Sequence, residues 1–187
     1  MAENGHDEVQ ALKRIIEITG LLNSTLNLDE LLQLIMSSAA ELLDAETSSL
    51  LLLDEDAGDL IIHVAIGEPG KQVAKERVPA GQGIAGWVVD HGETAVVESP
   101  KDDPRFYAGM DEASGFKTRN ILALPLKVRD RTVGVVEVIN KRDGGFTDTD
   151  QELAGALANQ AAIAIDNAQL YAKLADAVVT SRMSYRL

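Results

Sequence analysis

The chain has 187 residues, 45% of them hydrophobic and 25% charged, which suffices for one globular domain with a substantial core. Its formal net charge of -13 argues against nucleic-acid-binding surfaces and against binding to anionic membranes, because both require clustered Lys and Arg. The lack of cysteine excludes disulfides and thiol catalysis, and an acidic N-terminus without a membrane-length apolar run leads us to expect a cytoplasmic protein, or a cytoplasmic part of a larger one.

Two amphipathic helices are predicted to open the chain. Apolar residues recur at helical spacing between Val9 and Leu22, and they recur more regularly between Leu28 and Leu43. Asn27 comes directly before the second run, with Glu30 three residues further on, and this pairing is typical of a capped helix start.

The apolar pattern then changes from the helical period to runs of strand length. A turn at residues 56–59 joins the first two runs, and a turn at residues 129–131 joins the last two, so both pairs are expected to be antiparallel hairpins. Pro125 cannot donate a hydrogen bond to a neighbouring strand, so we expect a bulge or a sheet edge there. The predicted strands are residues 48–54, 60–66, 75–78, 95–98, 120–128 and 132–140.

Helical and loop-rich sequence separates the two hairpins. Three glycines within residues 81–86 lead into a helix that runs to His91 and ends at Gly92. Their spacing also fits the dinucleotide-binding fingerprint, but that fingerprint requires a parallel strand–helix–strand unit, and the surroundings predict antiparallel hairpins. A loop over residues 99–107 follows, and then a short helix up to Ala113.

A long final helix is predicted from Thr147, which can cap it, to about Val179. At about 1.5 Å per residue it is roughly 50 Å long, so its C-terminal part is expected to project from the domain. Two apolar stripes require two burial partners, and we predict the domain's own sheet and a second copy of the chain; the alternative is a helix wrapped by its own domain. One stripe is Leu153, Leu157, Gln160, Ala164, Asn167, Tyr171, Leu174 and Val178, and the other is Ala156, Ile163, Leu170 and Ala177.

These elements predict an α+β fold, an α/β sandwich with a central antiparallel sheet of about six strands. The terminal helices would cover one face of the sheet, and the helix and loop insertion would form a lid over the other face. A chamber between sheet and lid is the natural place for a ligand. We assign residues 1–24 to an N-terminal dimer or linker helix, residues 25–172 to the main domain and residues 173–187 to an extension of the final helix.

Three segments make the fold assignment specific. Residues 81–88 resemble the segment that opens a helix of GAF domains, and residues 106–126 resemble their lid and the strand that follows it. The third segment is similar to the Asn-Lys…Phe…Asp-Glu signature of cyclic-nucleotide-binding members, which occur in phosphodiesterases and some bacterial adenylyl cyclases. At these positions the chain has Asn140, Lys141, Phe146, Asp150 and, in place of Glu, Gln151.

By this resemblance the domain would bind a cyclic nucleotide, and the lack of cysteine excludes a covalently attached bilin. The phosphate would meet the backbone N–H groups of Ile84 and Ala85, and a helix start does offer unpaired N–H groups to an anion. Ile66 and Gly67 stand where guanine-binding pockets carry an aromatic residue and Asp, so the missing carboxylate favours cyclic AMP over cyclic GMP. The resemblance assigns ligand contacts to Ser49, Ile84, Ala85, Phe106, Tyr107, Asp111, Ser114, Thr118 and Glu137.

Structural roles are also open to these residues. The lid residues can pack, cap and turn the lid, and Lys141 and Asp150 can form an exposed ion pair, worth at most about 1 kcal/mol, between the last strand and the final helix. Arg105 and Arg119 can meet a phosphate or lie solvated at the sheet rim. His63 lies mid-strand and can in principle bind haem, as in some GAF sensors, although the histidines have no metal-ligand spacing.

We therefore expect a regulatory domain, not an enzyme, that senses a small molecule and relays its binding through a dimeric helix. Its parent would be a bacterial signalling protein, such as a two-component sensor kinase, a cyclase or a transcriptional regulator. The expected partners are a second copy, bound through the N- and C-terminal helices, the ligand, and an output domain, with no nucleic acid, membrane or metal. The alternatives are a ligand-free dimerisation or spacer module, a haem sensor and an enzyme.

Overall fold

A single antiparallel sheet forms the centre of the computed structural model, which describes residues 10, 13–15, 27–67, 71 and 73–184. The strand order is β3-β2-β1-β6-β5-β4, and every neighbouring pair is antiparallel. This confirms the predicted α+β fold, whereas most of the helix predicted over residues 1–24 lies outside the described residues. The strands are β1 (Ala45–Leu53), β2 (Leu60–Ala65), β3 (Arg77–Val78), β4 (Ala95–Val97), β5 (Ile121–Val128) and β6 (Arg131–Lys141).

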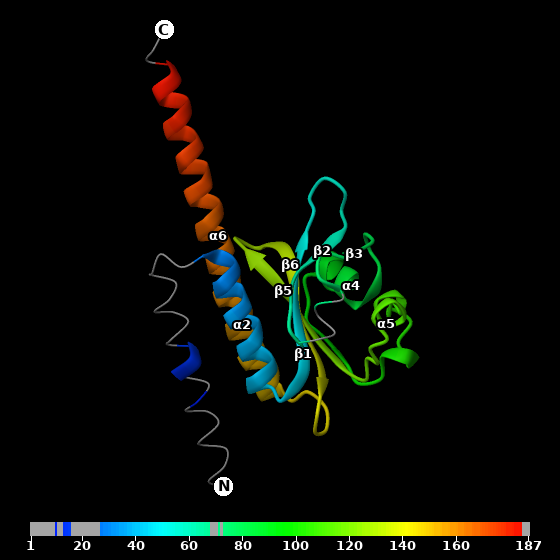
Figure 1. The fold of residues 1–187 in the computed structure, drawn as a ribbon. Coiled ribbons are helices and arrows are strands. Elements are labelled where there is room, and N and C mark those ends of the chain that lie inside the picture. The colour runs from blue at the N-terminus through cyan, green and yellow to red at the C-terminus, as the bar shows by residue number, and fades with distance from the viewer. Residues whose placement is uncertain (1–9, 11–12, 16–26, 68–70, 72, 185–187) are drawn as a thin grey trace.

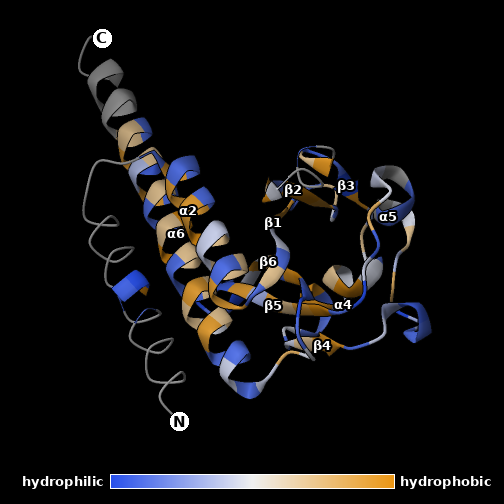
Figure 2. Ribbon diagram, turned by 60° about the horizontal axis from the view of Figure 1, so that its bottom comes forward, coloured by the Kyte–Doolittle hydropathy of each residue, from blue (hydrophilic) through white to orange (hydrophobic). Residues whose placement is uncertain are grey.

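Two helices cover one face of the sheet, α2 (Leu28–Leu42) and α6 (Asp148–Ser184). They lie side by side in Figure 1 and Figure 2, on the side of the sheet away from α4 and α5. Asn27 caps α2 as expected, since its Oδ1 accepts a hydrogen bond from the Asp29 N–H at 3.0 Å. In the core of this layer, large side chains of α2 pack against small and large side chains of α6. Its fully buried members include Leu32, Ile35, Met36, Ala154, Leu157 and Ala161.

The opposite face carries α4 (Gly83–His91), the short 3-10 turn Pro100–Asp102 and α5 (Gly109–Ser114). The chain can enter α4 only because Gly81 and Gly83 adopt positive φ angles of 71° and 72°. A side chain at Gly86 would come within 2.7 Å of the Gly81 carbonyl carbon. The glycines therefore serve a tight turn and close packing, and the antiparallel surroundings do not provide the parallel unit that a dinucleotide fingerprint needs.

The expectation for Pro125 is confirmed on both counts. The edge strand β4 pairs only with residues 121–123 of β5, so Pro125 lies beyond the reach of that neighbour. Directly after it, the register between β5 and β6 shifts between Leu126 and Lys127. The proline therefore occupies a position where β5 is itself an edge and where a bulge begins.

The final helix is longer than the sequence pattern indicates, since α6 continues to Ser184. Its first half packs on the sheet and on α2, and its second half projects from the body of the domain, as Figure 1 shows. Large apolar side chains of α6 remain exposed: Ile163, on the packed half, by 47%, and Leu170 and Leu174, on the projecting half, by 43% and 60%.

Candidate ligand-binding cavity

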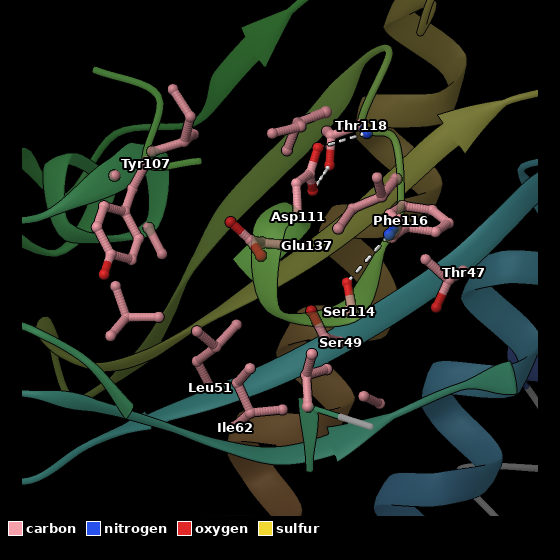
Figure 3. A pocket seen from close by; sticks show the side chains of 18 of the residues that line it. Thr47, Ser49, Leu51, Ile62, Tyr107, Asp111, Ser114, Phe116, Thr118 and Glu137 are labelled. Atoms are coloured by element: carbon pink, nitrogen blue, oxygen red, sulfur yellow. Dashed lines mark hydrogen bonds between the residues drawn. The ribbon is translucent and has the colours of Figure 1, made fainter. Parts of the chain in front are cut away.

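A hollow lies between the sheet and the lid, in the predicted position. About 800 Å³ of space lies between its atoms, including the part that is open to solvent. Strands β1, β2 and β6 provide the floor, α4 a wall, and residues 106–118 the roof (Figure 3). The described lining residues are Thr47, Ser49, Leu51, Ile62, Ala65, Val73, Val78, Gln82, Gly83, Ile84, Ala85, Phe106, Tyr107, Asp111, Ser114, Phe116, Thr118, Ile121, Glu137 and Ile139.

The structure brings all nine residues predicted to contact a ligand to this one cavity. Those residues are Ser49, Ile84, Ala85, Phe106, Tyr107, Asp111, Ser114, Thr118 and Glu137. That they bind a ligand stays a prediction. Sequence reasoning did not select the apolar part of the lining, such as Ile62, Val78 and Phe116, because these residues look like ordinary strand or loop residues.

One wall of the cavity is the start of α4. The first hydrogen bond of this helix runs from the Gly86 N–H to the Gln82 carbonyl, so the N–H groups of residues 83–85 precede the helical ladder. Gln82, at the N-cap position, makes no capping bond with its side chain. Ile84 and Ala85 are buried and line the cavity. A helix start with this geometry favours an anion.

The lid is held by hydrogen bonds of its own. The Asp111 carboxylate accepts from the Thr118 N–H at 2.8 Å and from the Thr118 hydroxyl at 2.6 Å, one bond on each oxygen. The Ser114 hydroxyl oxygen accepts from the Phe116 N–H at 3.2 Å. The roof of the cavity is therefore ordered without a ligand, and these residues have the structural role that the sequence left open.

Phe106 and Tyr107, two of the three aromatic lid residues, differ in their surroundings. Phe106 packs against the apolar cluster around α4. The Tyr107 ring lies over the α5 start, where a side chain at Gly109 would overlap it, and it is 37% exposed at the cavity rim. Tyr107 is thus an aromatic lining residue that is partly exposed at the cavity.

The floor carries a carboxyl group with unusual acidity. Glu137 on β6 lies directly across from Ser49 on β1. Figure 3 shows its side chain pointing into the cavity, between Asp111 and Ser49. Burial raises the pKa of Glu137 to about 7, and the hydrogen bond to Ser49 offsets part of that increase. Near neutral pH this group therefore exchanges between a neutral acid and a carboxylate.

The two candidate arginines are engaged elsewhere. Arg105 donates to both carboxylate oxygens of Asp103, at 2.9 and 2.7 Å, and its guanidinium lies 4.6 Å from the Trp87 ring centre. Arg119 donates to Glu46 at 2.7 Å. The pKa of each partner carboxyl is lowered, mainly by these arginine hydrogen bonds. Neither arginine lines the cavity, so of the two roles left open for them, contact with a phosphate in this cavity is not seen.

Asn140 clamps the segment that leaves the lid. It is fully buried, has a φ of 62°, and its Oδ1 accepts from the Arg119 N–H at 2.6 Å. Its Nδ2 donates to the Lys117 carbonyl at 2.8 Å and to Glu46 at 3.0 Å. Asn140 is therefore a structural residue at the base of the lid.

The predicted pair of Lys141 and Asp150 is present, with Nζ and Oδ2 2.7 Å apart, but it is not exposed. The two side chains are only 16% and 9% accessible, because the end of α2 covers them and the Leu43 carbonyl accepts from Lys141. Asp150 also accepts from the Thr147 N–H, and the Asp150 N–H donates to the Thr147 hydroxyl, which caps α6. Phe146 is buried in the adjacent core.

His63 does not reach the cavity. Its Nε2 lies 2.9 Å from Oδ1 of Asp29, at the start of α2 on the opposite side of the sheet. Among the described residues that line the cavity, none is a histidine or a methionine, and Tyr107 is the side chain of a kind that can bind haem iron. The described part of the chain also contains no cluster of acidic or histidine side chains that could hold a metal ion.

Comparison with known proteins places this architecture in a family. A family model described as GAF domain matches residues 25–166. The chain belongs to the GAF domain family. The GAF domain of a phosphoenolpyruvate-protein phosphotransferase from Coxiella burnetii superimposes with a TM-score of 0.78 at 23% identity, covering 87% of this chain and 96% of that one.

Two curated relatives contain similar sequence. The "Probable 3',5'-cyclic phosphodiesterase pde-5" of Caenorhabditis elegans is 29% identical over 178 residues, covering 89% of this chain and 24% of the relative. The dual 3',5'-cyclic-AMP and -GMP phosphodiesterase 11A of Takifugu rubripes is 30% identical over 174 residues, covering 84% and 19%. This GAF domain thus spans about a quarter or less of their length.

GAF domains are regulatory ligand-binding modules in multidomain proteins, and no catalytic domain is evident in this segment. No helix within the described residues is long and apolar enough to span a bilayer. The likeness to GAF domains of cyclic nucleotide phosphodiesterases supports a regulatory sensing role for this one.

Proposed function

We propose that this GAF domain binds a cyclic nucleotide in the cavity between sheet and lid. The observation that carries the proposal is the convergence of all nine resemblance-derived residues on one hollow, with the amides of Ile84 and Ala85 at its wall. The phosphate would accept from those amides, and Tyr107 offers a face for the base. The names of the two phosphodiesterase relatives point to the same ligand class.

The proposal includes a preference for cyclic AMP over cyclic GMP. Guanine has N–H groups that would donate hydrogen bonds to a carboxylate. Position 67, where guanine-binding pockets carry Asp, holds Gly in this chain. Of the two acidic lining residues, Asp111 already accepts two hydrogen bonds from Thr118. Asp111 and Glu137 are the carboxyl groups that the described lining offers to guanine, and position 67 adds none.

A thermal-shift and calorimetric titration with cyclic AMP and cyclic GMP tests the proposal. A ligand at about 100 times its dissociation constant should add about 2.7 kcal/mol of stability. For a domain of this size that corresponds to a rise in Tm of roughly 5–10 °C. A shift with cyclic AMP that exceeds the shift with cyclic GMP supports the proposal. No shift with either nucleotide would leave the spacer module as the better reading, and a Soret band in the purified protein would favour haem.

A pair of variants tests the location of the site. Replacing Asp111 and Thr118 together by Ala removes both lid hydrogen bonds and should weaken nucleotide binding while the domain stays folded. The matched control is Asp143→Ala, which removes an exposed carboxylate outside the cavity and should leave affinity unchanged. Unchanged affinity in the double variant would contradict the site assignment.

We further propose that the signal leaves through a parallel dimer of α6. Leu153, Gln160, Asn167 and Leu174 recur every seventh residue, and a second series of Ala156, Ile163, Leu170 and Ala177 interleaves with them. Among the described residues, Gln160 Oε1 is the buried side-chain atom without a hydrogen-bond partner. In a parallel coiled coil, polar residues at such positions face their counterparts and fix the register.

Sedimentation velocity tests the dimer. Leu174→Lys places a charge in the proposed seam and should weaken association at least tenfold, whereas Gln169→Lys, on another face of the exposed helix, should not. Equal association of both variants would contradict the seam. In this proposal, ligand binding alters the α6 dimer, and the dimer passes that change to an output domain. The parent would be a cytoplasmic bacterial signalling protein.

A further inference from the structure

The charges around the cavity do not suit an anion when every acid is ionised. Among the described residues that line the cavity, Asp111 and Glu137 are acidic, and none is Lys, Arg or His. The arginines of the surrounding loops are paired with Asp103 and Glu46, outside the cavity. A cyclic phosphate adds a negative charge to this space, so two ionised carboxylates would oppose its entry.

The two carboxyl groups differ in their contacts. Asp111 accepts two hydrogen bonds from Thr118, one on each carboxylate oxygen. Glu137 lies on the floor, across from Ser49 on β1 and from Ala123 on β5. The other described titratable group that lines the cavity is Tyr107; the lining residues from α4, β2 and β3 are apolar or glycine. Glu137 therefore has no base to keep it ionised.

We propose, building on the proposed function, that the cavity takes up its anionic ligand together with a proton, which Glu137 holds as a neutral carboxylic acid. The site would therefore take singly charged phosphodiesters and disfavour phosphate monoesters, which carry about two charges at pH 7. The backbone amides at the start of α4 supply only a partial positive charge, enough for one anionic group when the floor is neutral.

The acidity of Glu137 makes this coupling effective near neutral pH. Burial raises the pKa of this group to about 7, so the proton is held or taken up there at little cost. The protonated carboxyl also gains an O–H donor that the carboxylate lacks, and a phosphate oxygen or a purine ring nitrogen can accept from it.

Calorimetric titration of the whole chain with cyclic AMP and cyclic GMP at pH 6 and pH 8 tests the inference. The protonated fraction of a group with a pKa near 7 falls about tenfold between these values, so affinity should fall about tenfold as well. At pH 7, titrations in two buffers of different ionisation enthalpy should report uptake of about half a proton per nucleotide. The 5'-monophosphate of adenosine should bind at least tenfold more weakly than cyclic AMP.

Two variants separate Glu137 from the other groups. Glu137→Gln is neutral at every pH and should bind cyclic AMP with equal affinity at pH 6 and pH 8. Glu93→Gln removes one exposed carboxylate outside the cavity and should keep the tenfold change. If Glu137→Gln does not fold, proton uptake by the unmodified protein serves as the test: uptake of about half a proton per nucleotide at pH 7 supports the inference, and no uptake contradicts it.

Equal affinity of the unmodified protein at both pH values would overturn the inference and leave the proposed function standing. A Glu137→Gln variant that keeps the tenfold change would also overturn it, because another group would then carry the proton. Failure of both cyclic nucleotides to bind at either pH would overturn the proposed function, and the inference with it.

Discussion

Replacing Glu137 by Gln should change how the stability of the protein depends on pH. Burial raises the pKa of Glu137 from 4.5 to about 7, so the folded state keeps a proton that the unfolded chain releases between these values. The free energy of unfolding therefore falls as pH rises through this window, and the loss is complete above pH 7. The Glu137→Gln variant has no group to ionise at this position and escapes the loss.

The magnitude follows from the size of the pKa change. A difference of about 2.5 pH units corresponds to about 3.4 kcal/mol at 1.36 kcal/mol per unit, and about 2 kcal/mol of this falls between pH 5.5 and pH 8. The variant should therefore gain about 2 kcal/mol relative to the unmodified protein over that interval. All other titrating groups are shared, so their effects cancel in the comparison.

Urea denaturation of both proteins at pH 5.5, 6.5 and 8 measures this difference. These values stay above the sequence pI of about 4.6, where solubility is lowest. Glu93→Gln is again the control, since it removes the same charge from the surface. A difference between Glu137→Gln and the unmodified protein that stays constant with pH would refute the reasoning.

Substitutions at Asn140, Lys141 and Leu157 test the packing around the site by urea denaturation. Asn140→Ala should lower the free energy of unfolding by about 3 kcal/mol, because it removes buried hydrogen bonds and puts Ala at a φ of 62°. Asn140→Gly should lower it by about 1 kcal/mol less, because glycine adopts a positive φ without strain. Equal losses in the two variants would exclude a contribution from the backbone angle. Lys141→Ala should cost about 3 kcal/mol, and a loss below about 1 kcal/mol would mean that the pair behaves as an exposed one. Leu157→Ala should cost about 3 kcal/mol by leaving a cavity between α6 and the sheet, whereas Gln169→Ala, at an exposed position outside the proposed seam, should cost less than about 0.5 kcal/mol.

Hydrophobic periodicity predicted the elements well, except at their ends. The prediction for β1 began at residue 48, but the strand starts at Ala45, since the pairing with β6 extends to Lys141. Glu46 and Thr47 are polar and gave no apolar signal, so only this long-range pairing reveals them as strand residues. Similarly, α6 outruns its predicted end near Val179, because helix continuation does not require an apolar stripe.

The lining of the cavity was predictable because local motifs carry it, whereas the contacts that brace the lid were not. Glu46, Arg119 and Asn140 meet across separations of 73 and 94 residues, which no spacing rule detects. The raised pKa of Glu137 likewise depends on which side chains surround it in the folded state. Lys141 and Asp150 were expected at the surface because charged residues usually are, and the cover supplied by the end of α2 is a tertiary effect.

Asn140 and Lys141 are consecutive residues whose side chains contact different parts of the molecule. Asn140 binds Lys117 and Arg119 in the segment between the roof and β5, and Lys141 binds Asp150 in the first turn of α6. A single peptide group therefore links the residue that binds the lid segment to the residue that binds α6. Relative motion of the lid and α6 at this point is limited to the few backbone torsions around that peptide group.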